Sequence, residues 1–153
     1  MRANIPLDGL SSSDLLEDWA WLCKKPYTLI AMTNFGDMFL CDESGGVHFL
    51  DLLSAKLSSV ANSVTEFQEL AADKEKQRQW FLTDLLTEIE LAGPALSAGQ
   101  CFSFKKPPAL GGRVELANVE IASIAVYVSL MGQIHHQLKD LPPGTKIQGI
   151  KIR

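Results

Sequence analysis

The stretch that decides the fold runs from residue 28 to residue 60 and reads TLIAMTNFGDMFLCDESGGVHFLDLLSAKLSSV. It contains four short runs rich in apolar and β-branched residues, separated by segments of Gly, Asn, Asp and Ser that favour turns. These runs span 28–33, 38–41, 47–52 and 56–60. Parallel strands need a connection of a dozen or more residues, and the connections here are much shorter. We therefore predict an antiparallel meander.

Helical patterns flank this meander on both sides. The run Ser11-Ser-Ser13 offers N-caps for a first helix, which Pro26 ends. The apolar stripe of that helix consists of Leu15, Leu16, Trp19, Leu22 and Cys23. After the meander, Asn62 or Ser63 caps a helix whose inward residues are Val64, Phe67 and Leu70. A second helical stretch has an apolar face made of Phe81, Leu82, Leu85, Leu86 and Ile89.

The last third of the chain mixes strands with a longer helix. Strands are predicted at 101–106 and 119–123, and Pro142-Pro-Gly144 turns the chain into a short C-terminal strand. The helix between them has an inner face of Ile124, Tyr127, Val128, Met131, Ile134 and Leu138. Together these elements predict an α+β fold, in which the antiparallel meander sheet packs against helices in two layers.

Length and composition indicate a single compact domain. With 153 residues, 46% hydrophobic and 21% charged, the chain can bury a core without disulfides. We divide it into an N-terminal helical extension, 1–26, and an α+β domain, 27–153. The three cysteines lack C-x-x-C spacing, and the sequence shows neither a signal peptide nor an apolar run of membrane length. We therefore expect a cytoplasmic protein that does not enter a membrane.

Charge is unevenly distributed along the chain. Residues 1–92 hold fifteen Asp and Glu against seven Lys and Arg, a net charge of −8, whereas residues 93–153 have a net charge of +4. We expect no nucleic-acid partner for the acidic part, since phosphate binding needs a basic surface. A basic protein partner would suit it, although surface acids can also serve solubility alone.

Catalytic and metal-binding patterns are not evident, so we expect no catalytic residue, no metal and no cofactor. His135 and His136 are adjacent in a predicted helix and point about 100° apart, which prevents both from binding one metal in the usual i, i+4 manner. His48 with Asp37 or Asp51 would be the pair for a hydrolytic enzyme, but the chain offers no nucleophile motif beside it. The sequence favours a protein that is not an enzyme.

The acidic residues of the first predicted helix are the more promising site. Asp14, Glu17, Asp18 and Trp21 fall on the face opposite its apolar stripe, and an exposed Trp bordered by acids is typical of protein-binding hot spots. The alternative is that Trp21 packs under a neighbouring loop. The predicted hairpin adds Asp42 and Glu43 to the residues that we expect to bind a partner.

Three motifs together resemble a known bacterial family. They are Thr33-Asn-Phe-Gly-Asp37 with Gly46-Val-His-Phe-Leu-Asp51, then Cys101-Phe-Ser-Phe-Lys-Lys-Pro-Pro-Ala-Leu-Gly-Gly112, and finally Gly132-Gln-Ile-His135 leading to Leu141-Pro-Pro-Gly144. In this order they resemble the C-terminal domain of type VI secretion DNase-immunity proteins, over residues 27–150. We interpret Phe39, Phe102 and Leu110 as core, and the remaining structural signature is Gly36, Asp37, Gly46, Gly111 and Gly112.

This resemblance implies a protein that binds and neutralises a toxin, often a nuclease, inside the producing cell. An acidic inhibitor can occupy the basic cleft of a nuclease, so charge and resemblance point to the same partner, a basic toxin domain. The alternative is a regulatory module that binds a small molecule or a peptide in a pocket near the Leu110–Gly112 loop. The oligomeric state stays open.

Overall fold

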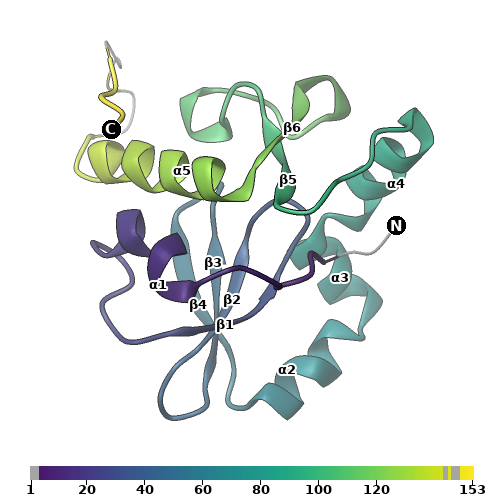
Figure 1. The fold of residues 1–153 in the computed structure, drawn as a ribbon, viewed down its shortest axis with the longest axis vertical. Helices are drawn as coiled ribbons and strands as arrows, with labels where there is room; N and C mark the ends of the chain where they lie inside the picture. The colour runs from purple at the N-terminus through teal and green to yellow at the C-terminus, as the bar shows by residue number, and fades with distance from the viewer. Residues whose placement is uncertain (1–3, 143–144, 146–148) are drawn as a thin grey trace.

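The computed structural model describes residues 4–142, 145 and 149–153. Its central feature is a four-stranded sheet of β1 (Thr28–Met32), β2 (Met38–Cys41), β3 (Val47–Asp51) and β4 (Lys56–Ala61). The strands are antiparallel in the order β1-β2-β3-β4, and they lie at the centre of the fold in Figure 1. The α+β class and the antiparallel meander predicted from the sequence are therefore confirmed.

A second, smaller sheet stands beside the meander. It pairs β5 (Gln100–Phe104) with β6 (Val119–Ser123) in antiparallel register. The Phe102 N–H donates to the carbonyl of Asn34 over 2.7 Å, which joins β5 to the turn between β1 and β2. Two 3₁₀ turns, η2 (Pro108–Leu110) and η3 (Leu116–Asn118), lie in the connection between these two strands.

Alternation along the strands sends side chains to both faces of the meander. Phe39 points to a face covered by α2 (Val64–Ala71) and α3 (Lys74–Phe81), where it packs with other aromatic rings. The rings around it belong to Phe49, Phe67, Trp80 and Phe81, with centroids 4.6 to 5.7 Å from that of Phe39. Met38 and Leu40 point to the opposite face.

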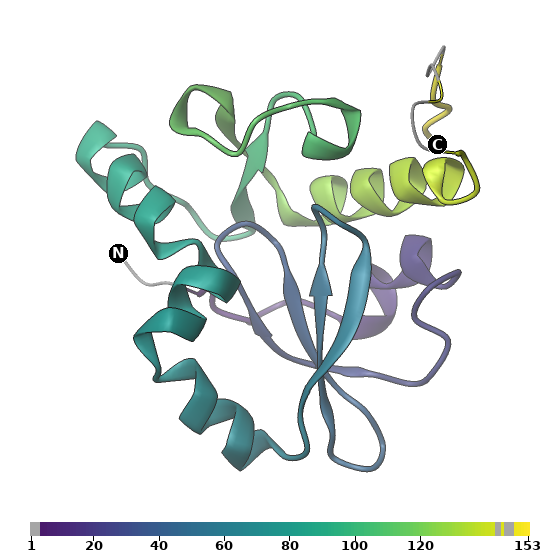
Figure 2. The same cartoon turned by 180° about the vertical axis from the view of Figure 1, so that it is seen from behind.

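The opposite face is covered by α5 (Ile124–Leu138) and by the N-terminal α1 (Ser12–Leu15) and η1 (Glu17–Trp19). Figures 1 and 2 show the meander between this pair of elements and the arm formed by α2 and α3. The predicted packing of a sheet against helices is thus present, and the structure adds a helical layer on the second face.

One helical prediction was wrong. The apolar face at 81–89 belongs to two helices, because α3 ends at Phe81 and α4 (Thr83–Ala92) begins after Leu82. Leu82 adopts a left-handed conformation with φ of +51°, which breaks the helix. The Asp73 carboxylate accepts from the Lys76 N–H and caps α3, so the first of the two helices starts well before the predicted face.

Four smaller differences concern single positions and the two ends of the chain. Val64 is 38% exposed rather than inward, because it opens the first turn of α2. Leu110 is half-buried in η2 rather than part of the core. The first helix is one turn of α-helix followed by a 3₁₀ turn, although Leu15 and Trp19 are buried as predicted. The predicted C-terminal strand is absent from residues 145 and 149–153, the part of that segment which the structure describes.

Two glycines of the structural signature occupy positions where a side chain would not fit. Gly36 has a φ of +87° in the tight turn closed by the bond from the Thr33 N–H to the Asp37 carbonyl. At Gly112 a Cβ would lie 1.7 Å from the carbonyl oxygen of Lys106. Glycine is therefore required in the β1–β2 turn and in the connection between β5 and β6.

Candidate functional site

Two indoles fix the N-terminal turn against α5. The Trp19 N–H donates to the Val128 carbonyl over 2.9 Å, and the Trp21 N–H donates to the carbonyls of Asp18 and Gly132 over 3.1 and 3.3 Å. The turn sits so close to the helix that a Cβ on Gly132 would lie 2.6 Å from the Asp18 carbonyl oxygen. The acidic residues predicted in this segment are therefore placed on a rigid support.

Trp21 is half-buried, with its ring between two others. It stacks on Trp19 at a centroid distance of 5.8 Å and on His136 at 5.4 Å, with an angle of 8° between the planes of Trp21 and His136. From the sequence, Trp21 could be either an exposed hot-spot residue or a ring packed under a neighbouring loop. Its exposure in the structure lies between these two alternatives. The two carbonyl acceptors and the His136 ring were not evident from the sequence, but a glycine inside a helical apolar run is a sign of close packing.

Asp18 differs from the other acids of this turn. Its carboxylate accepts a hydrogen bond from the Ser129 hydroxyl and forms an ion pair with the Arg153 guanidinium, and its side chain is only 10% exposed. Asp14 and Glu17 are exposed, and no side-chain interaction involves them in the part of the chain that the structure describes. Their negative charges remain available to a partner.

The predicted acidic hairpin forms a separate group. The Asp42 carboxylate bonds His48 at 2.7 Å and accepts from the backbone N–H groups of Ser44 and Gly46, which closes the β2–β3 turn. The His48 hydrogen bond holds the pKa of Asp42 below its usual range. Glu43 is exposed. No hydrogen bond or ion pair between described residues joins this hairpin to the side chains of Asp14 or Glu17.

His48 and Asp37 do not meet. His48 bonds Asp42, and the buried Asp37 carboxylate instead accepts from the Leu52 N–H over 2.8 Å and from the Thr33 hydroxyl over 3.1 Å. Burial, together with the negative charge of Asp51, raises the pKa of Asp37 to about 7. The other carboxylate considered from the sequence, Asp51, accepts from the Leu53 N–H and the Ser54 hydroxyl. Among the described residues His48 is therefore bonded to neither carboxylate of the hydrolytic hypothesis.

Other titratable groups of the core are held in neutral form. A ring nitrogen of His135 donates to the Leu52 carbonyl over 2.8 Å, and burial lowers the pKa of this histidine. Burial also raises the pKa of the Cys23 thiol to about 11 and that of Cys101 to about 12, which disfavours the reactive thiolate. Within the described residues no three His, Cys, Asp or Glu side chains gather as a metal site would require.

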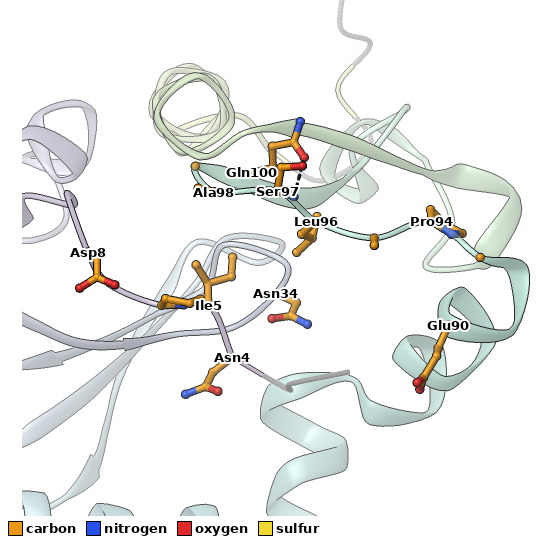
Figure 3. Close-up of a pocket in the computed structure, with 14 residues that line it drawn as sticks. Asn4, Ile5, Asp8, Asn34, Glu90, Pro94, Leu96, Ser97, Ala98 and Gln100 are labelled. Carbon is orange, nitrogen blue, oxygen red and sulfur yellow. Dashed lines mark hydrogen bonds between the residues drawn. The ribbon is translucent and has the colours of Figure 1, made fainter.

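A hollow of about 430 Å³ borders the predicted Leu110–Gly112 pocket, because Ala109 lines it together with Leu53 and Leu138, and two others lie away from this loop. One of these two, of about 630 Å³, lies between the N-terminal segment 4–8, the Asn34 turn, the end of α4 and the loop 93–100 (Figure 3). A smaller one, about 390 Å³, is lined by Glu17, Asp18 and Trp21 with the helix residues Gln133 and His136. This last hollow joins the predicted acidic residues to the α5 surface.

No helix in the described part of the chain combines the length and apolar character that crossing a membrane would require.

Comparison with known proteins identifies part of the chain. Residues 61–135 match the model of the family described as "T6SS immunity protein Tdi1, C-terminal", which confirms the resemblance predicted from the sequence over this segment. The match includes the motif at 101–112 and excludes the one at 33–51. No curated protein matches the chain in sequence.

A solved structure shares the fold. The crystal structure of Atu4351 from Agrobacterium tumefaciens superposes with a TM-score of 0.52 at 15% sequence identity. The similarity covers 79% of this chain, and this chain spans 62% of the length of that one.

Proposed function

We propose that this chain neutralises a bacterial toxin by occlusion, without catalysis, because residues 61–135 match the model of the C-terminal domain of T6SS immunity proteins. The family match is the observation that carries the proposal. It favours toxin binding over the regulatory module considered from the sequence.

We expect the partner to be a basic toxin domain, such as a nuclease that binds DNA. Residues 1–92 have a net charge of −8, and charge complementarity of this kind accelerates association and makes it sensitive to salt. A surface that blocks a basic cleft needs shape and charge rather than a nucleophile. The neutral core cysteines and the separate hydrogen-bond partners of Asp37 and His48 are consistent with such a role.

We place the contact surface on the N-terminal turn, around the hollow beside Trp21. Asp14 and Glu17 supply exposed carboxylates, and Trp21 supplies an aromatic ring fixed by two carbonyls and a stacked His136. The Asp18 carboxylate already binds the guanidinium of Arg153, so this position on the surface is suited to an arginine. Glu43 in the hairpin extends the acidic surface.

A protection assay in bacteria tests the proposal. The chain is co-expressed with the secreted toxin encoded by a neighbouring gene, and survival is compared between the wild type and the Asp14→Lys, Glu17→Lys double variant. We expect the wild type to protect better than the double variant. With purified chain and toxin, the double variant should associate about tenfold more slowly at low salt, because both steering charges are reversed.

The matched control reverses two exposed acids elsewhere, Glu69→Lys on α2 and Glu88→Lys on α4. This control makes the same change in net charge and should leave association near the wild-type rate. If both double variants lose the same amount, the contact surface is not the N-terminal turn. If the wild type gives no protection against any neighbouring secreted toxin, the proposed function is wrong.

A further inference from the structure

The strand β6 forms an open edge of the small sheet. Five residue pairs, from Gln100 opposite Ser123 to Phe104 opposite Val119, join one side of β6 to β5. No strand of the described chain pairs with its other side. Unpaired backbone groups along a strand edge are a template for pairing with another strand, which makes this edge a candidate interface.

The register shows which groups of β6 point outward. The Ile124 N–H donates to Gly99 and the Lys105 N–H donates to Asn118, so these two pairs at the ends of the ladder are hydrogen-bonded. Antiparallel pairs alternate between bonded and non-bonded, which makes Phe102 opposite Ile121 a non-bonded pair. Consistent with this, the Phe102 N–H turns away and donates to Asn34. The N–H and C=O of Ile121 therefore both face the open side.

The two neighbouring residues that face the open side each have one backbone group that is already hydrogen-bonded within the chain. By the same alternation Val119 and Ser123 face the open side, but the Val119 N–H already donates to the Leu116 carbonyl. Ser123 is the N-cap of α5, and the carbonyl of an N-cap residue accepts the first bond of its helix. Four groups remain for a partner: the Val119 C=O, the N–H and C=O of Ile121, and the Ser123 N–H.

These four groups complement themselves. We propose that β6 is the pairing edge of a two-fold dimer, in which the β6 strand of a second copy lies antiparallel to it and is centred on Ile121. The two Ile121 residues then exchange both of their hydrogen bonds. Each Ser123 N–H reaches the Val119 C=O of the other copy, so that every open donor meets an open acceptor. A shared self-complementary patch of this kind is the mark of a two-fold interface.

Side chains around the edge fit the same arrangement. Ile121 is 37% exposed, Leu116 precedes the strand at 38%, and Val126 follows it at 64%. Antiparallel pairing brings the end after Ser123 alongside the end before Val119 of the second copy, so Val126 approaches the other Leu116. Glu120 falls opposite Ala122, and the pairing therefore opposes no like charges.

This dimer is independent of the proposed function. The N-terminal turn bonds α5 at Val128, Ser129 and Gly132, beyond the end of β6 at Ser123, and a monomeric chain could still neutralise a toxin. The dimer and the toxin contact are therefore tested by separate variants.

Sedimentation equilibrium of the full chain tests the proposal. We expect concentration-dependent dimers of the wild type, and about tenfold weaker association of Ile121→Pro, which removes the central N–H donors. Edge strands tolerate proline, and circular dichroism reports whether this variant is folded. Ile121→Lys tests the same position through its side chain. The matched control is Val64→Lys on α2, where the exposed fraction, 38%, is nearly the same, and it should dimerise like the wild type.

Cysteine cross-linking tests the register, in a Cys41→Ser background. Bonded pairs in antiparallel sheets have Cα atoms about 5.5 Å apart, within disulfide range, so Ile121→Cys should cross-link to its own copy on mild oxidation. Val119→Cys should not, because the two Val119 residues would lie four positions apart along the strands, about 13 Å.

Three results would overturn the dimer. One is a wild type that stays monomeric up to about 1 mM, a concentration at which even weak pairs associate. Another is a wild-type dimer that both Ile121 variants leave unchanged, or a Val119→Cys variant that cross-links as fast as Ile121→Cys. The third is a monomeric wild type whose toxin binding is weakened by Ile121→Pro, which would assign the edge to a strand of the toxin instead.

Discussion

The Asp37 carboxyl places a titrating group inside the core, under the turn that joins β1 to β2. It accepts from the Leu52 N–H and the Thr33 hydroxyl, and so ties this turn to the end of β3. Burial and the nearby Asp51 charge raise its pKa to about 7, so the protonated form is favoured in the folded chain at mildly acidic pH. The chain should therefore be most stable at the pH where this group is neutral.

We predict that stability falls as pH rises through the Asp37 pKa. Between about pH 4, the pKa of an unfolded aspartate, and about pH 7, the folded chain binds more protons than the unfolded chain, so the free energy of unfolding decreases with pH. The contribution amounts to at most about 4 kcal/mol. Asp37→Asn should flatten this part of the profile in denaturant unfolding, and an unchanged slope in the variant would refute the assignment.

Asp42 provides a comparison of opposite sign. His48 holds its pKa below the usual range, so its contribution is present above about pH 4 and is lost as pH falls through the lowered pKa. In the Asp42→Asn variant, the free energy of unfolding should therefore fall less at acidic pH than in the wild type. Its decrease toward pH 7, which comes from Asp37, should be unchanged.

Close packing at Gly132 gives a second residue-level prediction. A Cβ there would lie 2.6 Å from the backbone oxygen of Asp18, so Gly132→Ala must push the N-terminal turn away from α5. We expect a loss of about 1–3 kcal/mol in the free energy of unfolding. Gly149→Ala is the control, because a Cβ at that position meets nothing within 4 Å, and equal losses in both variants would contradict the packing argument.

At the level of elements, the meander could be predicted because its signals are local. Each strand is a short apolar run, and each turn carries residues such as Gly36 and Gly45, both with positive φ. The break between α3 and α4 could not be predicted, since it falls at Leu82, a good helix former held in a left-handed conformation by the packing around it. Local preference was overruled there by tertiary contacts.

The β3–β4 turn stores strain at Ala55. Its φ of +56° is a left-handed value that costs an alanine roughly 1 kcal/mol and costs glycine little. Ala55→Gly should therefore raise the free energy of unfolding by up to about 1 kcal/mol. Ala125→Gly on the exposed side of α5 should lower it by up to a similar amount. If thermal or denaturant unfolding shows losses in both variants, the turn is not strained.

On the scale of the whole molecule, the sequence gives the number of charged residues but does not show which acidic side chains are paired with a partner in the fold. Asp14, Glu17 and Glu43 are exposed, whereas Asp18 is paired with Arg153 from the far end of the chain and Asp42 with His48. Such pairings depend on how distant segments fold together, which no local pattern records. The family resemblance could be found from the sequence because its motifs are local.

The stoichiometry of toxin inhibition tests the central claim most directly. Purified chain is titrated against the toxin of a neighbouring gene, toxin activity is measured, and the mixture is then separated in denaturant to recover the toxin. Occlusion predicts that inhibition saturates at one chain per toxin, weakens with salt, and leaves the recovered toxin chemically unchanged and active. Inhibition by far less than one chain per toxin, with the recovered toxin permanently modified, would show catalysis and contradict the claim.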